Sequence, residues 1–252
     1  MIVKTEEDLK GMREASHVVA VVLKKMMDHI EIGMSSKELD EYGGNLLKEM
    51  GARSAPFVEY KFPGYTCIST NNEACHGIPT KEKVFKNGDL INIDVSANLN
   101  GYYGDNGSSF ILGEDIQNLN PLVTASHEIL TKAIAHIKPG VKINTIGELI
   151  QNEAKKRGFT VIRNICGHGI GKKLHEEPSE IACWKDRLNR NRFKKDSAIA
   201  LETFISTKAK YVYEADDNWT LQTKDGSFVA QHEHTLIVKD GLPEILTWEN
   251  GI

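Results

Sequence analysis

The stretch INIDVSANLNGYYGDNGSSF, residues 91–110, contains two aspartates and no other charged side chain. Asp94 interrupts a run of apolar residues that is typical of a buried strand, and Asp105 follows a Gly-Tyr-Tyr-Gly segment. We interpret this segment as a turn between strands predicted over residues 89–97 and 107–112. Because an isolated ionised carboxylate loses its hydration in a buried strand, these aspartates require a partner that offsets the cost.

An internal repeat relates the two halves of the chain. The segment LKKMMDHIEIG, residues 23–33, matches LTKAIAHIKPG, residues 130–140, and Gly51 and Gly158 differ by the same offset of 107 residues. Helices are predicted over residues 6–29, 35–50, 121–137 and 145–157. Strands are predicted over residues 54–59, 66–70, 89–97 and 107–112, and then over 160–164, 198–206, 219–223 and 229–238. The order helix, helix, strands therefore occurs twice.

The same repeat pairs the unusual polar residues of the two halves. CISTNNEACHGIP aligns with CGHGIGKKLHEEP, VFKNGDLINIDVS with RFKKDSAIALETF, and GDNGSSFIL with HEHTLIVKD. The resulting pairs are Asp94 with Glu202, Asp105 with Glu233, and His76 with His175. Because no linker rich in Pro, Ser or Gly separates the halves, we predict one α/β domain over residues 1–252. Its halves would span about 1–115 and 116–252, with the functional site where they meet.

Composition restricts the class of protein. Of the 252 residues, 40% are hydrophobic and 26% are charged, which is ordinary for a globular protein. The net charge of -4 argues against nucleic-acid recognition, and the sequence has neither a membrane-spanning apolar run nor the pattern of a signal peptide. The four cysteines have no CxxC spacing, so we expect reduced thiols in a cytoplasmic protein.

The paired acids predict a metal site. A single buried carboxylate is usually satisfied by hydrogen bonds or by a cation, and that explanation stays open for each residue alone. Together, Asp94, Asp105, Glu202 and Glu233 form a set with no adjacent Lys or Arg, which favours a multivalent cation. His168 and His175 lie among glycines that allow close backbone approach. Carboxylates with one imidazole suit Mn(II), Fe(II), Co(II) or Zn(II), and this number of ligands suits two ions that activate a water.

The remaining histidines and cysteines favour structural roles. His29 and His136 end helices, where an imidazole complements the helix dipole. His232 and His234 flank Glu233 in a strand and should therefore point to the opposite face. Cys75 would be a candidate nucleophile only with a base placed beside it, and the sequence does not indicate one.

At these residues the sequence resembles the methionine aminopeptidases of type I, bacterial form. The matching stretches are APFVEYKFPGYTCISTNNEACHGIP, GDLINIDVSANLNGYYGD, ICGHGIGKKLHEEP and SFVAQHEHTLIV, and they cover nearly the whole chain. The resemblance implies the pita-bread fold, which consists of two pseudo-symmetric halves around a curved antiparallel sheet and a dinuclear metal centre.

The resemblance also implies roles for individual residues. His76 and His175 would orient the peptide and stabilise the tetrahedral intermediate, and Glu202 would also handle the proton of the attacking water. The implied metal ligands are Asp94, Asp105, His168, Glu202 and Glu233. The implied methionine pocket is Phe62, Cys67, Leu174 and Trp219. Without the resemblance, Phe62 and Trp219 would be interpreted as ordinary core aromatics.

Three positions beside implied ligands depart from the family pattern. Asn106 stands where the family usually has Thr, Thr203 where it usually has Pro, and His232 where histidine is uncommon. We expect these departures to affect catalytic rate or metal preference more than the reaction class.

The implied activity is removal of the initiator methionine from nascent polypeptides at the ribosome when the second residue is small. We expect a cytoplasmic monomer that recognises neither nucleic-acid sequence nor membrane. The alternatives are an Xaa-Pro-type aminopeptidase or dipeptidase of the same fold, whose members usually carry an additional N-terminal domain, and a non-catalytic pita-bread binding module.

Overall fold

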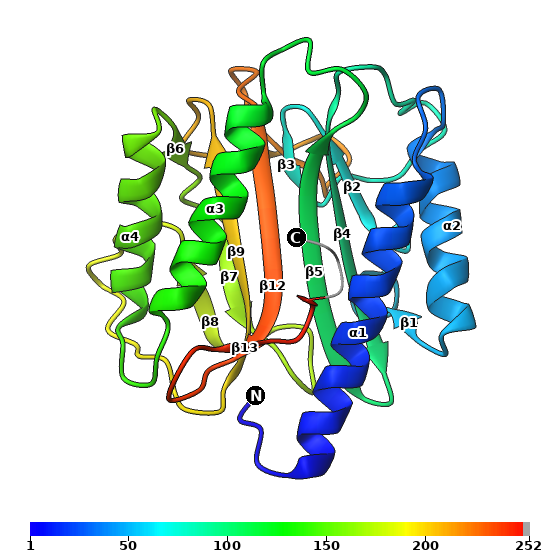
Figure 1. The fold of residues 1–252 in the computed structure, drawn as a ribbon. Coiled ribbons are helices and arrows are strands. Elements are labelled where there is room, and N and C mark those ends of the chain that lie inside the picture. Colours follow the sequence, from blue (N-terminus) through cyan, green and yellow to red (C-terminus); the bar gives the residue numbers. More distant parts are fainter. Residues whose placement is uncertain (249–252) are drawn as a thin grey trace.

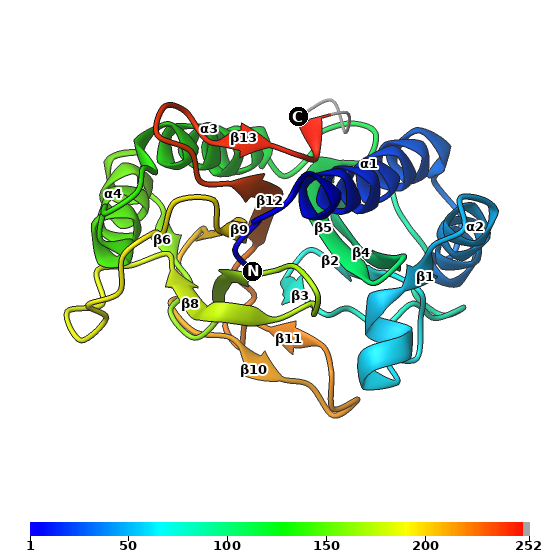
Figure 2. The ribbon, with the colours of Figure 1, turned by 90° about the horizontal axis from the view of Figure 1, so that it is seen from below.

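The computed structural model describes residues 1–248 and has helices on one side and strongly curved strands on the other (Figures 1 and 2). The helices are α1 (Glu6–His29), α2 (Ser36–Glu49), α3 (Asn120–His136) and α4 (Ile143–Lys156). Each agrees with a helix predicted from the sequence to within two residues at either end. Among the described residues, no helix combines the length and the apolar character that crossing a membrane requires.

The strands of the described region form three antiparallel sheets. The first contains β1 (Arg53–Ser54), β4 (Leu90–Leu99) and β2 (Cys67–Thr70), in that order, and β5 (Tyr102–Ile111) also pairs with β4. The second has the order β13 (Glu244–Ile245), β12 (Val229–Ile237), β9 (Ala198–Ser206), β7 (Cys166–Gly169) and β8 (Glu176–Ala182), and β6 (Thr160–Val161) pairs with β9. The third consists of β10 (Tyr213–Glu214), β11 (Leu221–Gln222) and β3 (Glu73–Cys75).

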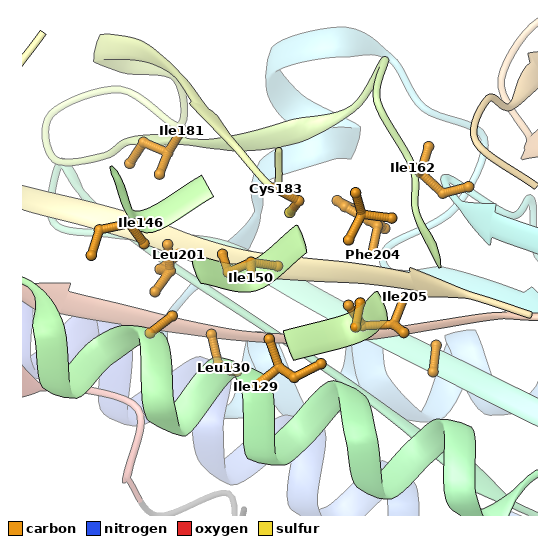
Figure 3. Packing of buried hydrophobic residues seen from close by; sticks show 14 of the residues in the cluster. Ile129, Leu130, Ile146, Ile150, Ile162, Ile181, Cys183, Leu201, Phe204 and Ile205 are labelled. Atoms are coloured by element: carbon orange, nitrogen blue, oxygen red, sulfur yellow. The ribbon is translucent and has the colours of Figure 1, made fainter. Parts of the chain in front are cut away.

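Strand periodicity separates a helix-facing side of each sheet from a concave side. Along β4, Ile91, Ile93 and Val95 belong to the core that α1 and α2 cover, so Asp94 between them faces the other way. In the second half, α3 covers β9 and β12, and α4 packs beside it against β6 and β8. Figure 3 shows side chains of both helices meeting those of β9, among them Ile129, Leu130, Ile146, Ile150, Leu201 and Ile205. Both halves therefore leave their concave faces free for polar side chains.

The hairpin between β4 and β5 corrects one prediction. The turn consists of Asn100 and Gly101, whose φ angles of 52° and 82° match the type I′ turn that suits tight hairpins. The prediction of a turn at the Gly-Tyr-Tyr-Gly segment is therefore wrong, because β5 already begins at Tyr102. Gly104 lies inside the strand, where a Cβ would come within 2.8 Å of the Ala15 carbonyl oxygen. This glycine allows close approach of α1 and does not mark a turn.

A second correction concerns residues 54–59, which were predicted as a strand. Only Arg53–Ser54 is extended, and the π-helical turn η1 (Pro56–Tyr60) follows. Pro56 takes the first position of this turn, where its missing N–H costs no hydrogen bond. Lys61 ends the turn with a φ of 58° in the left-handed region. This irregular segment brings Tyr60 and Phe62 to the concave side.

The two halves meet along β5 and β12, which lie side by side at the centre of Figure 1. The Ser109 hydroxyl accepts a hydrogen bond from the Gln231 N–H and donates one to the Gln231 carbonyl, both at 2.9 Å. The Thr235 hydroxyl likewise accepts a hydrogen bond from the Asp105 N–H at 3.0 Å and donates one to the Asp105 carbonyl at 2.7 Å. Hydroxyl groups thus replace the backbone ladder that would otherwise join the two sheets.

Strand register shows how the halves correspond. Asp94 lies opposite Gly107 in the first hairpin, and Glu202 lies opposite Glu233 in the second. When Asp94 is matched with Glu202, Gly107 therefore occupies the position in the first hairpin that Glu233 occupies in the second. In the same way, Asp105 occupies the position of Gln231. The sequence alignment that paired Asp105 with Glu233 was wrong by two residues at this point, whereas Asp94 and Glu202 do correspond.

Candidate metal centre

A cavity of about 490 Å³ opens on the concave side, between the halves. Its walls include every residue to which the sequence assigned a role in the site. These are Phe62, Cys67, His76, Asp94, Asp105, His168, Leu174, His175, Glu202, Trp219 and Glu233. The structure therefore brings the predicted ligands, histidines and pocket residues into one place, while their individual roles stay predictions.

The acidic side chains come from four long central strands. Asp94 and Asp105 lie on β4 and β5, and Glu202 and Glu233 lie directly opposite one another on β9 and β12. Asp105, Glu202 and Glu233 are each less than 9% exposed. Because rigid strands hold these side chains, their separation is set by the sheets and not by loop conformation.

His168 on β7 completes the cluster. Its Nδ1 atom is 2.9 Å from the Gly169 carbonyl oxygen, which can only accept, so Nδ1 carries the proton. The Nε2 atom then presents a lone pair and lies 3.6 Å from Asp105 Oδ2. One ligand atom each from Asp105, His168 and Glu233 lies within 4.8 Å of the others. This separation allows a single ion to contact all three.

Burial and mutual repulsion disfavour ionisation of this cluster. Burial, followed by the charge of Asp94, raises the pKa of Asp105 well above its usual range. Burial and the neighbouring acids raise the pKa of Glu202 and of Glu233 in the same way. Burial also raises the pKa of Asp94, to about 6. Without a compensating cation, these groups would not all be ionised at neutral pH.

The residues present fit a divalent metal. Asp105 Oδ1 is buried and has no hydrogen-bond partner among residues 1–248, although a buried carboxylate oxygen normally has one. The part of the cavity wall that the structure describes contains neither Lys nor Arg. Oxygen donors with one imidazole suit Mn(II), Fe(II), Co(II) and Zn(II), and the donor set does not distinguish these metals.

Two further histidines line the cavity beside the acids. His76 has a φ of 55°, an unusual left-handed backbone for a non-glycine residue, at the end of β3. The neighbouring Gly77 packs so tightly that a Cβ would lie 2.3 Å from the Ile68 carbonyl oxygen. Desolvation by surrounding protein atoms, followed by His175, lowers the pKa of His76, and the same desolvation, followed by His168, lowers the pKa of His175 to about 4, although both side chains remain exposed to the cavity. Both imidazoles are therefore neutral at physiological pH.

Tyr60 is a cavity residue that the sequence interpretation missed. Its hydroxyl lies 2.6 Å from His175 Nδ1, and the two rings are 5.7 Å apart between centroids. When the hydroxyl donates to Nδ1, the proton of the neutral imidazole sits on Nε2, the nitrogen left available to a ligand. The contact was missed because residues 54–59 were predicted as a strand, and a strand would not have turned Tyr60 toward the second half.

Most of the remaining cavity wall is apolar. Phe62 and Trp219 meet edge to face, with ring centroids 5.3 Å apart, and Cys67 and Leu174 also line the cavity. Burial raises the pKa of Cys67 and of Cys75 well above the usual thiol range, so neither forms a thiolate at neutral pH. Cys75 accordingly lines the cavity as a neutral thiol.

The three departures from the family pattern face away from the cavity. The Thr203 hydroxyl lies 2.9 Å from that of Ser126 on α3, and His232 packs against His127 of the same helix. Asn106 is fully buried and pairs with Val95, which belongs to the helix-facing core. Each departure is adjacent to a candidate ligand in sequence but points to the other side of the strand. We therefore expect these residues to act on the site through the strands that carry the ligands, and the predicted effect on rate or metal preference stays a prediction.

Comparisons with known proteins agree with this geometry. Residues 10–240 match the model of metallopeptidase family M24. The chain is 46% identical to methionine aminopeptidase 2 of Bacillus subtilis over 98% of this chain and 99% of that protein. It is 37% identical to the methionine aminopeptidase of Escherichia coli K12, over 97% and 93% of the two chains.

Solved structures show the same fold. The crystal structure of methionine aminopeptidase from Thermotoga maritima superposes with a TM-score of 0.92 at 36% identity, covering 98% of this chain and 99% of that one. The prolidase of Pyrococcus horikoshii superposes with a TM-score of 0.77 at 21% identity, covering 98% of this chain and 63% of that one, and shows the fold alone. The pita-bread fold predicted from the sequence is thereby confirmed. The chain belongs to metallopeptidase family M24.

Proposed function

We propose that this protein is a methionine aminopeptidase of type I, which removes the first methionine from polypeptides whose second residue is small. The observation that carries the proposal is the buried set of carboxylates and one imidazole beneath an apolar wall. Relatives named methionine aminopeptidase, similar over nearly their whole length, support the same assignment.

The metal-binding part of the proposal assigns two divalent ions to the acidic cluster. Asp94, Asp105, His168, Glu202 and Glu233 would hold them. When bound, such ions would supply Lewis acidity at the scissile carbonyl and a water of lowered pKa. Glu202, on the second-half side of the cluster, is the residue that we propose to hold the proton during the reaction.

His76 and His175 are proposed to contact the reacting peptide bond. Both imidazoles are neutral, so each can donate one N–H to the carbonyl oxygen and to the oxyanion that develops from it. The Tyr60 hydroxyl on His175 Nδ1 leaves Nε2 for this contact. A donor that is already oriented stabilises the developing charge without further reorganisation.

The apolar wall is proposed to receive the methionine side chain. Phe62, Cys67, Leu174 and Trp219 offer carbon and sulfur surfaces, which suit an unbranched thioether. The edge-to-face contact of Phe62 with Trp219 fixes both rings and hence the width of this slot.

The assignment to type I and the cellular setting are part of the proposal. The described second half, residues 116–248, runs from α3 to β13 without the long insertion that type II members carry. The cysteine spacing favours the cytoplasm, and the proposed substrates are N-termini of nascent polypeptides at the ribosome. The proposed form is a monomer, and no contact with a membrane or with specific nucleic-acid sequences is proposed.

Methionine release from short peptides tests this function. The protein, supplied with Mn(II), Co(II) or Fe(II), should release methionine from Met-Ala-Ser and much less from Met-Leu-Ser. The Asp94→Ala variant is the control and should lose most of the activity. Release from neither peptide with any of the metals would refute the proposal, and full activity of Asp94→Ala would refute the ligand set.

The rival functions predict different outcomes. An Xaa-Pro peptidase would cleave a Gly-Pro dipeptide or an Xaa-Pro peptide and spare Met-Ala-Ser. A non-catalytic binding module would retain no metal after dialysis, whereas the proposed enzyme should bind two equivalents. Retention of every predicted ligand in one cavity favours the enzyme over the module.

A further inference from the structure

The amide of Gln231 lies against two acids of the candidate metal centre. Gln231 precedes Glu233 by two residues on β12 and is 1% exposed. Its Nε2 atom is 3.0 Å from Glu233 Oε2 and 3.3 Å from Glu202 Oε2. One amide group therefore donates to both glutamates of the second half, in a place where a cation would otherwise be expected.

Asn92 fixes the direction in which this amide points. The Asn92 Nδ2 atom is 2.7 Å from Gln231 Oε1, and it also lies 3.2 Å from the Ser109 hydroxyl. Since Oε1 accepts from Asn92, the Nε2 side of the amide must face the carboxylates. All of these groups are buried, so solvent does not compete for the hydrogen bonds.

Gly107 provides the space that the amide occupies. A Cβ at this position would lie 2.3 Å from Gln231 Oε1 and 2.6 Å from Nε2. Gly107 does not have a positive φ, so backbone conformation does not require glycine here. The first half therefore supplies a glycine where the second half carries Glu233, and the amide enters the gap.

We propose that Gln231 is a positioning residue for the metal centre, which orients Glu202 and Glu233, and that Asn92 and Gly107 act through it. The inference rests on the metal centre of the proposed function. A neutral amide can satisfy one oxygen of each glutamate without cancelling the negative charge that attracts the metal. A Lys or Arg in this position would pair with the acids and compete with the ion.

Metal affinity tests the inference independently of catalysis. Metal-free protein is titrated calorimetrically with Mn(II), and the electron paramagnetic resonance spectrum of bound Mn(II) is recorded. Gln231→Leu should weaken binding by about 10–100-fold, the usual effect of losing a group that orients a metal ligand, and should alter the spectrum. The matched control is Gln117→Leu, because Gln117 donates one amide hydrogen bond to the Gly88 carbonyl and neither residue lines the cavity, so this variant should retain wild-type affinity.

A second variant retains the glutamine. Gly107→Ala places a methyl group against the amide and should also weaken Mn(II) binding. Gly241→Ala is its control, because no atom lies within 4 Å of an added Cβ there. This pair keeps the proposal testable even if Gln231→Leu does not fold.

A double-mutant cycle tests whether Asn92 acts through Gln231. Asn92→Leu alone should weaken Mn(II) binding, while adding it to Gln231→Leu should change the affinity by less than about threefold. Unchanged affinity and an unchanged spectrum in both Gln231→Leu and Gly107→Ala would overturn the inference, and fully additive effects would overturn the role of Asn92. Failure of the wild-type protein to bind any of Mn(II), Co(II) and Fe(II) would instead refute the metal centre of the proposed function.

Discussion

At the scale of single residues, the candidate centre depends on neutral imidazoles as much as on carboxylates. His168 donates a hydrogen bond to the Gly169 carbonyl and thereby presents Nε2 to the acids. His175 accepts a hydrogen bond from the Tyr60 hydroxyl on its Nδ1 atom. In both cases a neighbouring group determines which nitrogen faces the cavity. The chemical role of each histidine therefore depends on a partner that is distant in sequence or belongs to the backbone.

The first prediction at this scale concerns His175. Replacement of His175 by Ala should lower kcat for Met-Ala-Ser by about 10²–10³-fold, because a preorganised donor to the oxyanion is lost. Bound metal, measured by elemental analysis, should stay at the wild-type level. His29→Ala is the control, since His29 stacks on Tyr42 away from the cavity and should retain full activity. Loss of metal from His175→Ala would contradict the assigned role.

The second prediction concerns His232 and pH. Burial lowers the pKa of His232 to about 3, while an unfolded chain has an imidazole pKa near 6.5. As pH falls from 6.5 toward 3, the unfolded state gains a proton that the folded state does not, so stability decreases. For metal-free protein, His232→Phe should reduce the loss of unfolding free energy between pH 7 and pH 5 by about 2 kcal/mol.

Urea unfolding of both proteins at pH 7 and pH 5 measures this difference. Above pH 7 the two proteins should respond to pH in the same way, because His232 is neutral in both the folded and the unfolded state. An equal acid response of the two proteins between pH 7 and pH 5 would contradict the prediction.

At the scale of elements, strand alternation and tight turns determine where each acid points. Asn100 and Gly101 close the β4–β5 hairpin with both residues in the left-handed region, and this fixes the register that places Asp94 and Asp105 on the concave face. The sequence predicted the two strands but placed the turn too late, because glycine marks turns and close contacts alike. Gly104 allows α1 to pack closely against the strand, and this contact can be seen only in the folded structure.

Gly101→Ala tests the turn. No atom lies within 4 Å of an added Cβ at this position, so the expected cost is the left-handed backbone alone, about 1–2 kcal/mol. Urea denaturation should show this decrease with an unchanged m-value. Gly241→Ala, which adds the same methyl group without a positive φ, should change stability by much less. Equal stability of the two variants would show that the turn conformation carries no cost.

At the scale of the whole molecule, the site and the junction between the halves share the same strands. The internal repeat predicted that the acids would meet at this junction, and the helices and long strands followed from their hydrophobic periodicity. The sequence did not indicate Gln231 or Tyr60 as members of the site. Their placement depends on strand register and on an irregular π-turn, which local patterns do not encode. Strands β3, β7 and β8 were missed because their small, histidine and charged residues lack a strand pattern, and β10 and β13 were missed because each has only two residues.

The hydroxyl groups at the junction give the next prediction. Thr235→Val keeps the shape of the side chain but removes the hydroxyl that forms hydrogen bonds with the N–H and the carbonyl of Asp105. The buried N–H and carbonyl groups then lose their partner, which should destabilise the protein by about 1–3 kcal/mol. Ser109→Ala should have a similar effect on the Gln231 backbone. Unfolding monitored by circular dichroism measures the loss, and wild-type stability of both variants would contradict the joining role.

Metal removal gives the last prediction. Without metal, repulsion among the buried acids disfavours the folded state, so chelation should lower Tm. Addition of Mn(II) at 100 times its Kd should raise the unfolding free energy by about 2.7 kcal/mol for each site. Differential scanning calorimetry measures both shifts. Asp94→Ala should respond less to Mn(II), and a wild-type Tm that is insensitive to Mn(II) would contradict the site.

The depth of the acidic cluster has a consequence for the timing of the proposed reaction. Because Asp105, Glu202 and Glu233 lie almost entirely below the surface, only an extended chain end can reach them. A polypeptide whose first residues have already joined a folded core would present no such end. Cleavage would therefore compete kinetically with folding of the substrate, and proteins whose N-termini fold early would keep a larger share of their first methionine.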